Sequence, residues 1–309
     1  MDSVNTFVSV FIVTYNSSDY IVEALESIKL QTYKDIELVV SDDCSKDNTV
    51  ELVKNWLNNN SQRFVRTEIV ETGKNTGTAA NYNRAVKACR GEWLKMLDGD
   101  DLLKPDCIEK NVDFVKKNPD AEVVFSNVQN FKVQNGEKVN TGCYFTKDHD
   151  LFFSLDSLGQ LKVLMKNNIL PSASCFIKAS LLREFPYDET YFCLEDAPMW
   201  FTLLQNGIRF HSFNDITAMY RIGESAMRGE DVYFKRIYFD SYRQYFWDVK
   251  LKLCKKYDLQ DAYNITRKYM LQMDLADMLL KNRRTFFHDI LYFGIKIFIR
   301  LSPKFRLMK

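Results

Sequence analysis

The chain has 309 residues, of which 46% are hydrophobic and 27% are charged, so it is long enough to form one large globular domain or two smaller ones. Its formal net charge of +1 gives no general attraction to nucleic acid, and we expect no nucleic-acid partner. The seven cysteines are scattered and form no CxxC pair, which argues against a disulfide framework or a structural zinc site and favours a reducing, cytoplasmic location.

Apolar strand patterns alternate with helical patterns over the N-terminal third. Runs rich in β-branched and aromatic residues predict buried strands at 7–15, 36–40, 67–70 and 92–97. Apolar residues at helical spacing predict helices from about residue 21, over 48–57 and over 78–89. This alternation is typical of an α/β fold with a doubly wound, mostly parallel sheet. We expect neither a signal peptide nor a membrane-spanning helix.

Polar residues stand where three of these strands end. Thr14 and Tyr15 follow the first strand, Asp42 and Asp43 the second, and Asp98 a later one. In an open parallel sheet, ligands bind outside the carboxyl ends of the strands. We therefore expect a binding site at this edge, although one of the acids at 42–43 has the alternative role of capping the next helix.

Residues 93–101 join a short apolar run to three carboxylates, those of Asp98, Asp100 and Asp101. Acids this close repel one another, and a hard cation such as Mg²⁺ or Mn²⁺ would neutralise them. The alternative is a solvated turn, because Asp-Gly is common turn chemistry.

The loop 73–77 is rich in glycine but fits neither a Walker loop nor the GxGxxG pattern of dinucleotide folds. Lys74 in this loop is a candidate to steady a diphosphate, and the alternative is a solvated surface lysine.

The middle of the chain predicts further strands and one acidic helix start. A strand is expected over 121–128, a hairpin around 134–137, and another strand within 168–182. Glu195 and Asp196 precede a helical pattern that stops at Gly207. Acids at a helix N-terminus have a simple alternative role, since they complement the helix dipole.

The C-terminal third predicts two or three helices over 231–280, with a break near Asp258, and an amphipathic helix over 285–301. Residues 281–309 carry eight basic residues against one acid, a net charge of +7. This pattern favours a helix that lies on the inner face of the cell membrane as a peripheral contact. The alternative is a terminal helix packed on the protein with its basic face in water.

The motifs over about residues 8–120 resemble, in their order, those of the inverting glycosyltransferases of family 2, which have the Rossmann-like GT-A fold. The resemblance rests on Thr14-Tyr15-Asn16, Ser27…Gln31-Thr32-Tyr33, the acidic segment 42–49, Asn75-Thr76-Gly77…Asn83, and the segment 91–101. Two positions depart from the family pattern. Cys44 stands where Gly is usual, and Tyr82 stands where an Arg commonly precedes the Asn.

For the donor side, the resemblance implies a catalytic domain over 1–230 with a helical extension over 231–309. It implies that Thr14, Tyr15 and Asp43 line a nucleoside pocket. Donor-binding roles would also fall to two residues of the loop and helix that follow, Lys74 and Asn83.

The resemblance further implies that Asp98 and Asp100 are the acids of the family's DxD motif. Asp100 would be the more direct ligand of Mg²⁺ or Mn²⁺, and Asp98 would bond to the ribose or the metal. The metal would neutralise the charge that grows on the leaving nucleoside diphosphate.

On the acceptor side, the resemblance implies that Glu195 binds substrate and that Asp196 is the general base, which takes the proton from the acceptor hydroxyl as it attacks. Arg221, in the segment 219–225, would hold a phosphate.

These features predict a metal-dependent inverting glycosyltransferase of the hexosyl- or N-acetylhexosaminyl-transferring class. It would move a sugar from a nucleotide-sugar to a hydroxyl of a glycan or lipid-linked glycan in envelope polysaccharide biosynthesis. Two alternatives stay open. A nucleotidyltransferase on a similar α/β scaffold would need a Gly-rich Arg/Lys signature that is absent near the N-terminus. A non-catalytic nucleotide- or carbohydrate-binding protein would not need acids at both 98–101 and 195–196.

Overall fold

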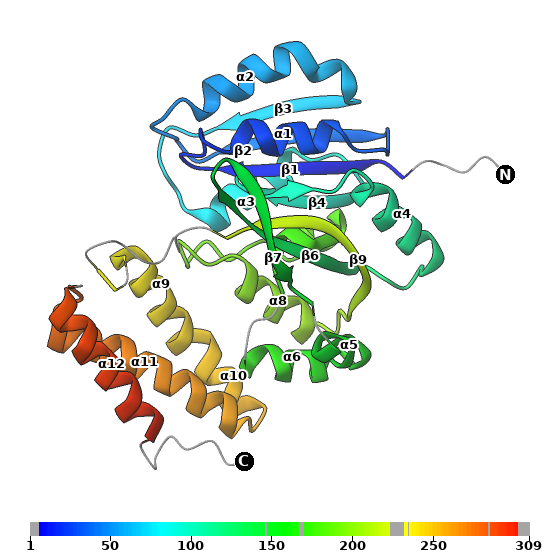
Figure 1. Ribbon diagram of the computed structural model, residues 1–309. Helices are drawn as coiled ribbons and strands as arrows, with labels where there is room; N and C mark the ends of the chain where they lie inside the picture. Colours follow the sequence, from blue (N-terminus) through cyan, green and yellow to red (C-terminus); the bar gives the residue numbers. More distant parts are fainter. Residues whose placement is uncertain are drawn as a thin grey trace. The chain divides into compact units, whose positions relative to one another are not determined.

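The computed structural model describes residues 6–145, 147–166, 170–222, 232–233, 235–283 and 285–301 (Figure 1). The chain forms two compact units. The first consists of Met1–Leu161, Ile169–Glu189 and Glu195–Gly223, and the second of Lys162–Asn168, Thr190–Leu194 and Glu224–Lys309. All of the predicted site residues belong to the first unit, which also contains the sheet.

The sheet has nine strands among the described residues, with the main order β3-β2-β1-β4-β8-β6-β9-β5. Its parallel half consists of β3 (Arg66–Glu71), β2 (Ile36–Asp42), β1 (Val8–Thr14) and β4 (Trp93–Asp98). In the other half, β8 (Cys175–Lys178) runs antiparallel to both β4 and β6 (Val123–Gln134), while β9 (Phe210–Arg221) is parallel to β6. Two antiparallel strands complete it: β5 (Leu102–Leu103) on β9 and β7 (Glu137–Cys143) on β6. The predicted α/β class is confirmed.

In the N-terminal third, helices follow the strands as the alternation predicted, and further helices lie beyond it. The helices of the first unit are α1 (Ile21–Lys29), α2 (Thr49–Asn60), α3 (Thr78–Ala88), α4 (Cys107–Lys117), α5 (Lys147–Ser154), α6 (Ser157–Lys166), α7 (Ala179–Glu184) and α8 (Asp196–Gln205). Two short 3-10 helices, η1 (Ser61–Arg63) and η2 (Ser172–Ser174), complete the set. The last residues of α6 belong to the second unit.

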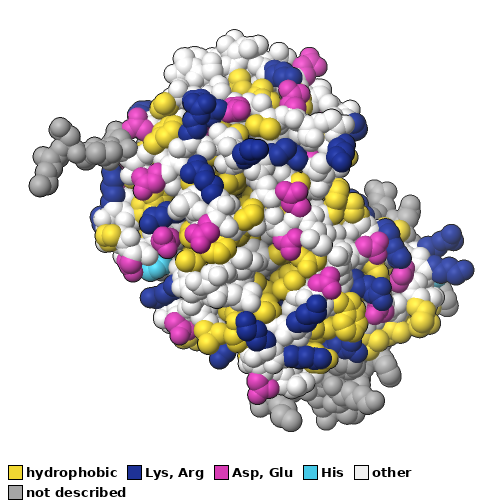
Figure 2. Space-filling model, turned by 180° about the vertical axis from the view of Figure 1, so that it is seen from behind, with side chains coloured by type: hydrophobic (Ala, Val, Ile, Leu, Met, Phe, Trp, Pro, Cys, Tyr) yellow, Lys and Arg dark blue, Asp and Glu magenta, His cyan; other side chains and the backbone are white. Residues whose placement is uncertain are grey.

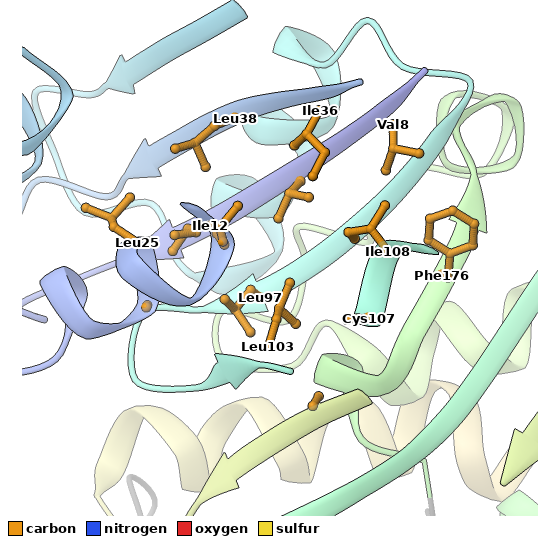
Figure 3. Close-up of a cluster of buried hydrophobic side chains, with 14 of the residues drawn as sticks. Val8, Ile12, Leu25, Ile36, Leu38, Leu97, Leu103, Cys107, Ile108 and Phe176 are labelled. Carbon is orange, nitrogen blue, oxygen red and sulfur yellow. The ribbon is translucent and has the colours of Figure 1, made fainter. Parts of the chain in front are cut away.

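Strand β1 lies at the centre of the parallel half, and all seven of its residues are buried. Val8 and Ile12 face a core to which α1, α2 and α4 also contribute. Figure 3 shows part of this core in close-up. Phe11 points the other way and meets the Tyr82 ring of α3 edge-on, with the ring centroids 5.6 Å apart. A strand covered on both faces needs an almost continuous apolar sequence, which explains why this run shows little alternation.

The register of the sheet brings the polar strand ends together. Thr14 at the end of β1 is paired with Asp42 of β2, and Val13 is paired with Asp98 of β4. The carboxyl ends of three neighbouring parallel strands therefore meet along one edge, as the positions of the polar residues predicted.

The second unit is helical. Its helices are α9 (Arg236–Tyr245), a π-helical turn η3 (Phe246–Lys250), α10 (Leu251–Lys256), α11 (Gln260–Leu280) and α12 (Phe286–Leu301). The predicted break near Asp258 is confirmed, since this residue has a φ of 51° between α10 and α11. Among the helices that the structure describes, none combines the length and the apolar composition needed to cross a membrane.

The surface carries charges of both signs. Figure 2 shows Lys and Arg side chains interspersed with Asp and Glu side chains over the face seen from behind. Exposed hydrophobic side chains lie among them, and several belong to α12. Positive and negative side chains are thus interspersed over this face.

Candidate functional site

Asp43, directly after β2, is buried and holds the loop in front of α3. Its carboxylate accepts hydrogen bonds from the backbone N–H groups of Thr76 (3.0 Å) and Gly77 (2.8 Å). The Thr76 hydroxyl donates a third bond at 2.7 Å, and the Arg84 guanidinium of α3 forms an ion pair at 2.6 Å. Gly77 has a φ of 94°, which favours glycine. These contacts fix the loop 75–77 against the carboxyl edge of the sheet.

The neighbouring Asp42 has a different task. Its carboxylate accepts bonds from the Thr14 hydroxyl (2.8 Å) and from the backbone N–H (2.8 Å) and hydroxyl (2.5 Å) of Ser45. Asp42 thus stabilises the turn after β2, but it does not cap α2, which begins at Thr49 and whose first N–H group is reached by Asp47. Tyr15, the next residue after β1, is 46% exposed at the same edge.

Cys44 has a φ of 68°, in the left-handed region. Side chains with a Cβ seldom adopt this conformation, whereas glycine does so without strain. Cys44 therefore occupies a turn position that requires a positive φ, where the family usually has glycine. The turn keeps its shape, with Lys46 Nζ 3.0 Å from the Cys44 sulfur.

Asp98 ends β4 and is partly buried. Burial, together with the nearby charge of Asp100, raises the pKa of Asp98 to about 6. Two hydroxyl groups oppose this shift, because hydrogen bonds to a carboxylate favour its ionised form. They come from Tyr82, at 2.8 Å, and from Ser172 of η2. Asp98 is thus held in one orientation by donors from α3 and η2.

Gly99 allows the acidic turn to form. A Cβ at this position would lie 2.9 Å from the Ser17 hydroxyl oxygen and 3.2 Å from the Thr14 methyl group. The turn that follows β4 thus passes directly over the end of β1, where only glycine fits without displacing a neighbour.

Asp100 is exposed and Asp101 is buried. One carboxylate oxygen of Asp101 accepts the backbone N–H of Arg221 at 2.9 Å. The other oxygen is buried and has no hydrogen-bond partner among the described residues. Burial and the charges of Asp100 and Asp98 raise the pKa of Asp101 well above its ordinary value.

Glu195 and Asp196 lie at the start of α8. Glu195 occupies the N-cap position, but its side chain makes no capping hydrogen bond. Burial raises the pKa of Glu195 well above its ordinary value, and the charges of Asp196 and Asp98 add to the effect. The charge of Asp196 also acts on Asp98. The structure therefore brings together, in one electrostatic site, the acids after β4 and the acids before α8.

The other predicted site residues are Lys74, Asn83 and Arg221, and each has different surroundings. Lys74 is exposed in its loop. Asn83 exchanges two hydrogen bonds with the backbone of Tyr187, each of 2.9 Å. Arg221 donates its Nε to the carbonyl oxygen of Asp100 at 2.8 Å.

The sequence analysis gave no role to several residues that surround the acids. Tyr82, Tyr144, Tyr187 and Tyr220 each have a pKa raised by burial and by at least one site acid. Lys95 is fully buried in β4 and donates to the carbonyl oxygens of Ala173 (2.5 Å) and Cys175 (3.2 Å). Lys95 thereby anchors η2, which carries Ser172 to Asp98. A lysine inside an otherwise apolar strand is the sequence feature that could have indicated this anchor.

The acidic turn fits a divalent cation. No group of three or more His, Cys, Asp and Glu side chains in the described ranges is arranged to hold a metal ion by itself. Mg²⁺, however, is usually bound through one or two carboxylates together with substrate phosphates. Two observations match such a site. One oxygen of Asp101 is buried without a partner among the described residues, and the charge of Asp100 raises the pKa values of Asp98 and Asp101. A bound cation would offset the repulsion among these carboxylates.

Comparison with solved structures identifies the class of fold. The chain resembles TarS of S. aureus in complex with UDP-GlcNAc, with a TM-score of 0.57 and 17% identity over 94% of this chain and 90% of that one. It also resembles the mannosyltransferase PcManGT from Pyrobaculum calidifontis in complex with GDP-Man and Mn²⁺, with a TM-score of 0.58 and 17% identity over 97% and 82% of the chains. These similarities show a GT-A glycosyltransferase fold.

Comparison of sequences identifies the family. Residues 9–183 match Glycosyl transferase family 2, and the chain belongs to this family. It is 28% identical over 217 residues to the uncharacterized glycosyltransferase MJ1057 of Methanocaldococcus jannaschii, covering 70% of each chain. It is 27% identical over 216 residues to the Escherichia coli UDP-Glc:alpha-D-GlcNAc-diphosphoundecaprenol beta-1,3-glucosyltransferase WfaP, covering 70% of this chain and 77% of the relative. The protein is therefore a glycosyltransferase, and the two alternative classes are set aside.

Proposed function

We propose that this glycosyltransferase moves a hexosyl or N-acetylhexosaminyl group from a nucleotide-sugar to a hydroxyl of a glycan or lipid-linked glycan, with inversion, in envelope polysaccharide biosynthesis. The observation that carries the proposal is that Asp98, at the end of β4, and Asp196, at the start of α8, lie near enough for the charge of Asp196 to help raise the pKa of Asp98. A donor-side acid and an acceptor-side acid in one site are what a single displacement at the anomeric carbon requires.

On the donor side, Thr14, Tyr15 and Asp43 would line the nucleoside pocket. The loop 75–77 supports this assignment, since Asp43 holds it in place and the Tyr15 ring is exposed at the same edge of the sheet. Lys74 and Asn83 would contribute from the loop and from α3. The names of TarS and PcManGT complexes mention UDP-GlcNAc and GDP-Man, which supports a nucleotide-sugar donor of this class.

Asp98 and Asp100 would hold Mg²⁺ or Mn²⁺ between the protein and the two phosphates. When bound, the cation neutralises the charge that develops on the leaving nucleoside diphosphate. Tyr82 and Ser172 would keep Asp98 oriented toward this position, because both donate to its carboxylate. The Mn²⁺ named with PcManGT supports the choice of ion.

Asp196 would be the general base. Its carboxylate would accept the proton of the acceptor hydroxyl while the oxygen attacks the anomeric carbon from the side opposite the diphosphate, and one such displacement inverts the configuration. Glu195 would bind substrate beside it. The raised pKa of Glu195 supports these separate roles of Asp196 as base and Glu195 as substrate ligand. A neutral Glu195 can donate a hydrogen bond without adding a charge next to Asp196.

One experiment tests the donor and acceptor halves. The protein is incubated with a panel of nucleotide-sugars and Mn²⁺, and released nucleoside diphosphate is measured. Asp100→Ala should lower release by at least about 100-fold, the usual scale for removing transition-state charge stabilisation. Asp196→Asn should retain donor binding and lose transfer. Asp150→Asn, at an exposed position on α5, is the matched control. Undiminished release by Asp100→Ala would refute the metal assignment.

The lipid-linked acceptor agrees with a peripheral membrane contact through residues 281–309. In α12 the side chains of Ile290, Leu291, Phe293 and Ile297 are between 41% and 64% exposed. Another side of α12 packs on α11, where Gln272 donates to the Tyr292 hydroxyl at 2.6 Å. The exposed apolar side chains within a segment of net charge +7 fit a surface of anionic lipid. The name of WfaP mentions a diphosphoundecaprenol-linked sugar, which supports the same class of acceptor.

Vesicle flotation tests this contact. Replacing Ile290 and Phe293 together by Ser should reduce flotation with vesicles that contain phosphatidylglycerol. The matched control replaces Leu30 and Val65 by Ser, since each is 62% exposed in the first unit. Equal flotation of the two double variants would overturn the membrane proposal and favour a terminal helix that only packs on the protein.

A further inference from the structure

Arg221, the last residue of β9, is held between two aromatic rings. Its guanidinium carbon lies 4.7 Å from the ring centre of Tyr20 and 4.6 Å from that of Phe131. The side chain is only 8% exposed, and it forms an ion pair with Glu23 of α1. Stacking on two faces and an ion pair at the edge leave this guanidinium a single orientation.

The same residue contacts the acidic turn at two points. Its Nε donates to the carbonyl oxygen of Asp100 at 2.8 Å, and its backbone N–H donates to the carboxylate of Asp101 at 2.9 Å. The Asp101 backbone N–H in turn bonds to the Asp98 carbonyl oxygen at 3.1 Å. The end of β9 thus fixes both the backbone and one carboxylate of the turn that follows β4.

We propose that Arg221 is a positioning residue, which holds the turn at Asp100 and Asp101 so that the Asp100 carboxylate faces the cation. The side chain acts through the backbone and does not itself contact a phosphate. This inference rests on the proposed metal-binding function of the turn. It replaces the phosphate-binding role that the resemblance implied for Arg221, because Nε donates to the Asp100 carbonyl oxygen, Nη2 donates to Glu23, and two aromatic rings lie over the guanidinium.

Glu23 is the second member of the arrangement. Burial alone would raise its pKa, but hydrogen bonds from Lys138 and Arg221 bring the pKa of Glu23 below its ordinary value. Glu23 is therefore ionised at neutral pH. Lys138 belongs to β7, so the carboxylate of Glu23 is shared between the β6–β7 hairpin and the guanidinium of Arg221. A change at Glu23 would loosen Arg221 and, through it, the acidic turn.

Two variants separate positioning from phosphate binding. Arg221→Lys keeps the positive charge and loses both the planar stacking and the Nε donor. Glu23→Gln keeps Arg221 and loses its ionic partner. We expect both variants to speed hydrogen–deuterium exchange in the peptide 98–104 without metal or nucleotide present. Both should also weaken Mn²⁺ binding, measured by electron paramagnetic resonance, by about 10-fold for Arg221→Lys and less for Glu23→Gln.

Arg63→Lys is the matched control, because Arg63 also donates to backbone carbonyl oxygens, those of Lys29, Gln31 and Tyr33, none of which belongs to the acidic turn. It should leave exchange in 98–104 and Mn²⁺ binding unchanged. The Arg221→Lys, Glu23→Gln double variant should be no weaker than Arg221→Lys alone, since both changes loosen one contact. The KM for donor should change less than kcat.

Wild-type exchange in 98–104 for both single variants would overturn the proposal. So would an Arg221→Lys variant that binds Mn²⁺ normally and only raises the KM for nucleotide-sugar, which is the result expected of a phosphate ligand. Asp100→Ala tests the metal-binding function of the turn separately from the positioning role of Arg221. If it too leaves Mn²⁺ binding unchanged, the metal-binding function fails; if it abolishes binding while Arg221→Lys does not weaken it, only the positioning role fails.

Discussion

Tyr82 donates its hydroxyl to Asp98 across 2.8 Å, from the middle of α3 to the end of β4. Tyr82 has no exposed surface, and burial and the charge of Asp98 raise its pKa well above the ordinary value. Where family members commonly carry an arginine, this chain has a neutral donor that keeps an acid in place.

We predict that Tyr82→Phe leaves the fold intact and lowers donor turnover by about 10-fold. The change removes one hydrogen bond to a charged group, worth roughly 1.5 kcal/mol. Turnover is measured as nucleoside diphosphate released. Tyr187→Phe is the control, since that ring is also buried and lies against Tyr82 at a tilt of 54°, while its hydroxyl donates a weak bond to the Met96 sulfur at 3.9 Å. Equal turnover in the two variants would contradict the prediction.

Replacing Cys44 by Gly should raise the free energy of unfolding by about 1 kcal/mol. The φ of 68° strains a residue with a Cβ, and glycine removes that strain at a smaller entropic cost. Urea denaturation measures the difference. Cys44→Ala keeps the Cβ and should show no such gain, and a Gly variant that is no more stable than the Ala variant would rule the strain out.

The stability of the first unit should depend on pH through Asp47. Burial acts to raise its pKa, but hydrogen bonds from Thr49 and Ser18 outweigh it and lower the pKa to about 2. The folded value lies below the unfolded value of about 3.9, so the stabilisation is complete above that pH and disappears as the pH falls toward 2.

The variant Asp47→Asn measures this contribution. The difference in unfolding free energy between wild type and variant should be about 1 kcal/mol at pH 6, as for other side chains that satisfy N–H groups at a helix start. Because Asp47 is exposed, solvent screening limits it to that range. The difference should shrink steadily below pH 4, and a constant difference from pH 6 to pH 2 would argue against the mechanism.

Gly99→Ala should disrupt the acidic turn, because the added methyl group would lie 2.9 Å from the Ser17 hydroxyl oxygen. We expect lower thermal stability and at least about a 10-fold loss of turnover, since a shift of about 1 Å at a catalytic group is costly. Ser17→Gly in the same chain should restore part of both. Failure of this second change to restore either quantity would show that the contact with Ser17 is not the cause.

The strands and the binding edge could be predicted because they depend on local patterns. Buried parallel strands need apolar runs, and the residues that end them are free to be polar, so Thr14, Asp42 and Asp98 were visible in order. The antiparallel insertion of β8 between β4 and β6 was not visible. Its four residues, Cys175–Lys178, read as any short apolar strand, and pairing between distant segments leaves no mark in one sequence.

The direction of side chains on α3 could not be predicted either. Successive residues of a helix point about 100° apart, so Tyr82, Asn83 and Arg84 face three different neighbours. The resemblance singled out Asn83, whereas the structure directs Tyr82 to Asp98 and Arg84 to Asp43. Deciding among the three requires the helix to be docked on the sheet, which composition and spacing do not specify.

The bonds around Asp43 have one further consequence. Its carboxylate is already satisfied by Thr76, Gly77 and Arg84, so the loop 75–77 is held in place without any ligand. A nucleoside that binds there would lose its own freedom but would not have to freeze a loop, and the association would carry only a small penalty from the protein's conformational entropy. Calorimetry should then find a modest heat-capacity change, limited to the surface that the nucleoside covers.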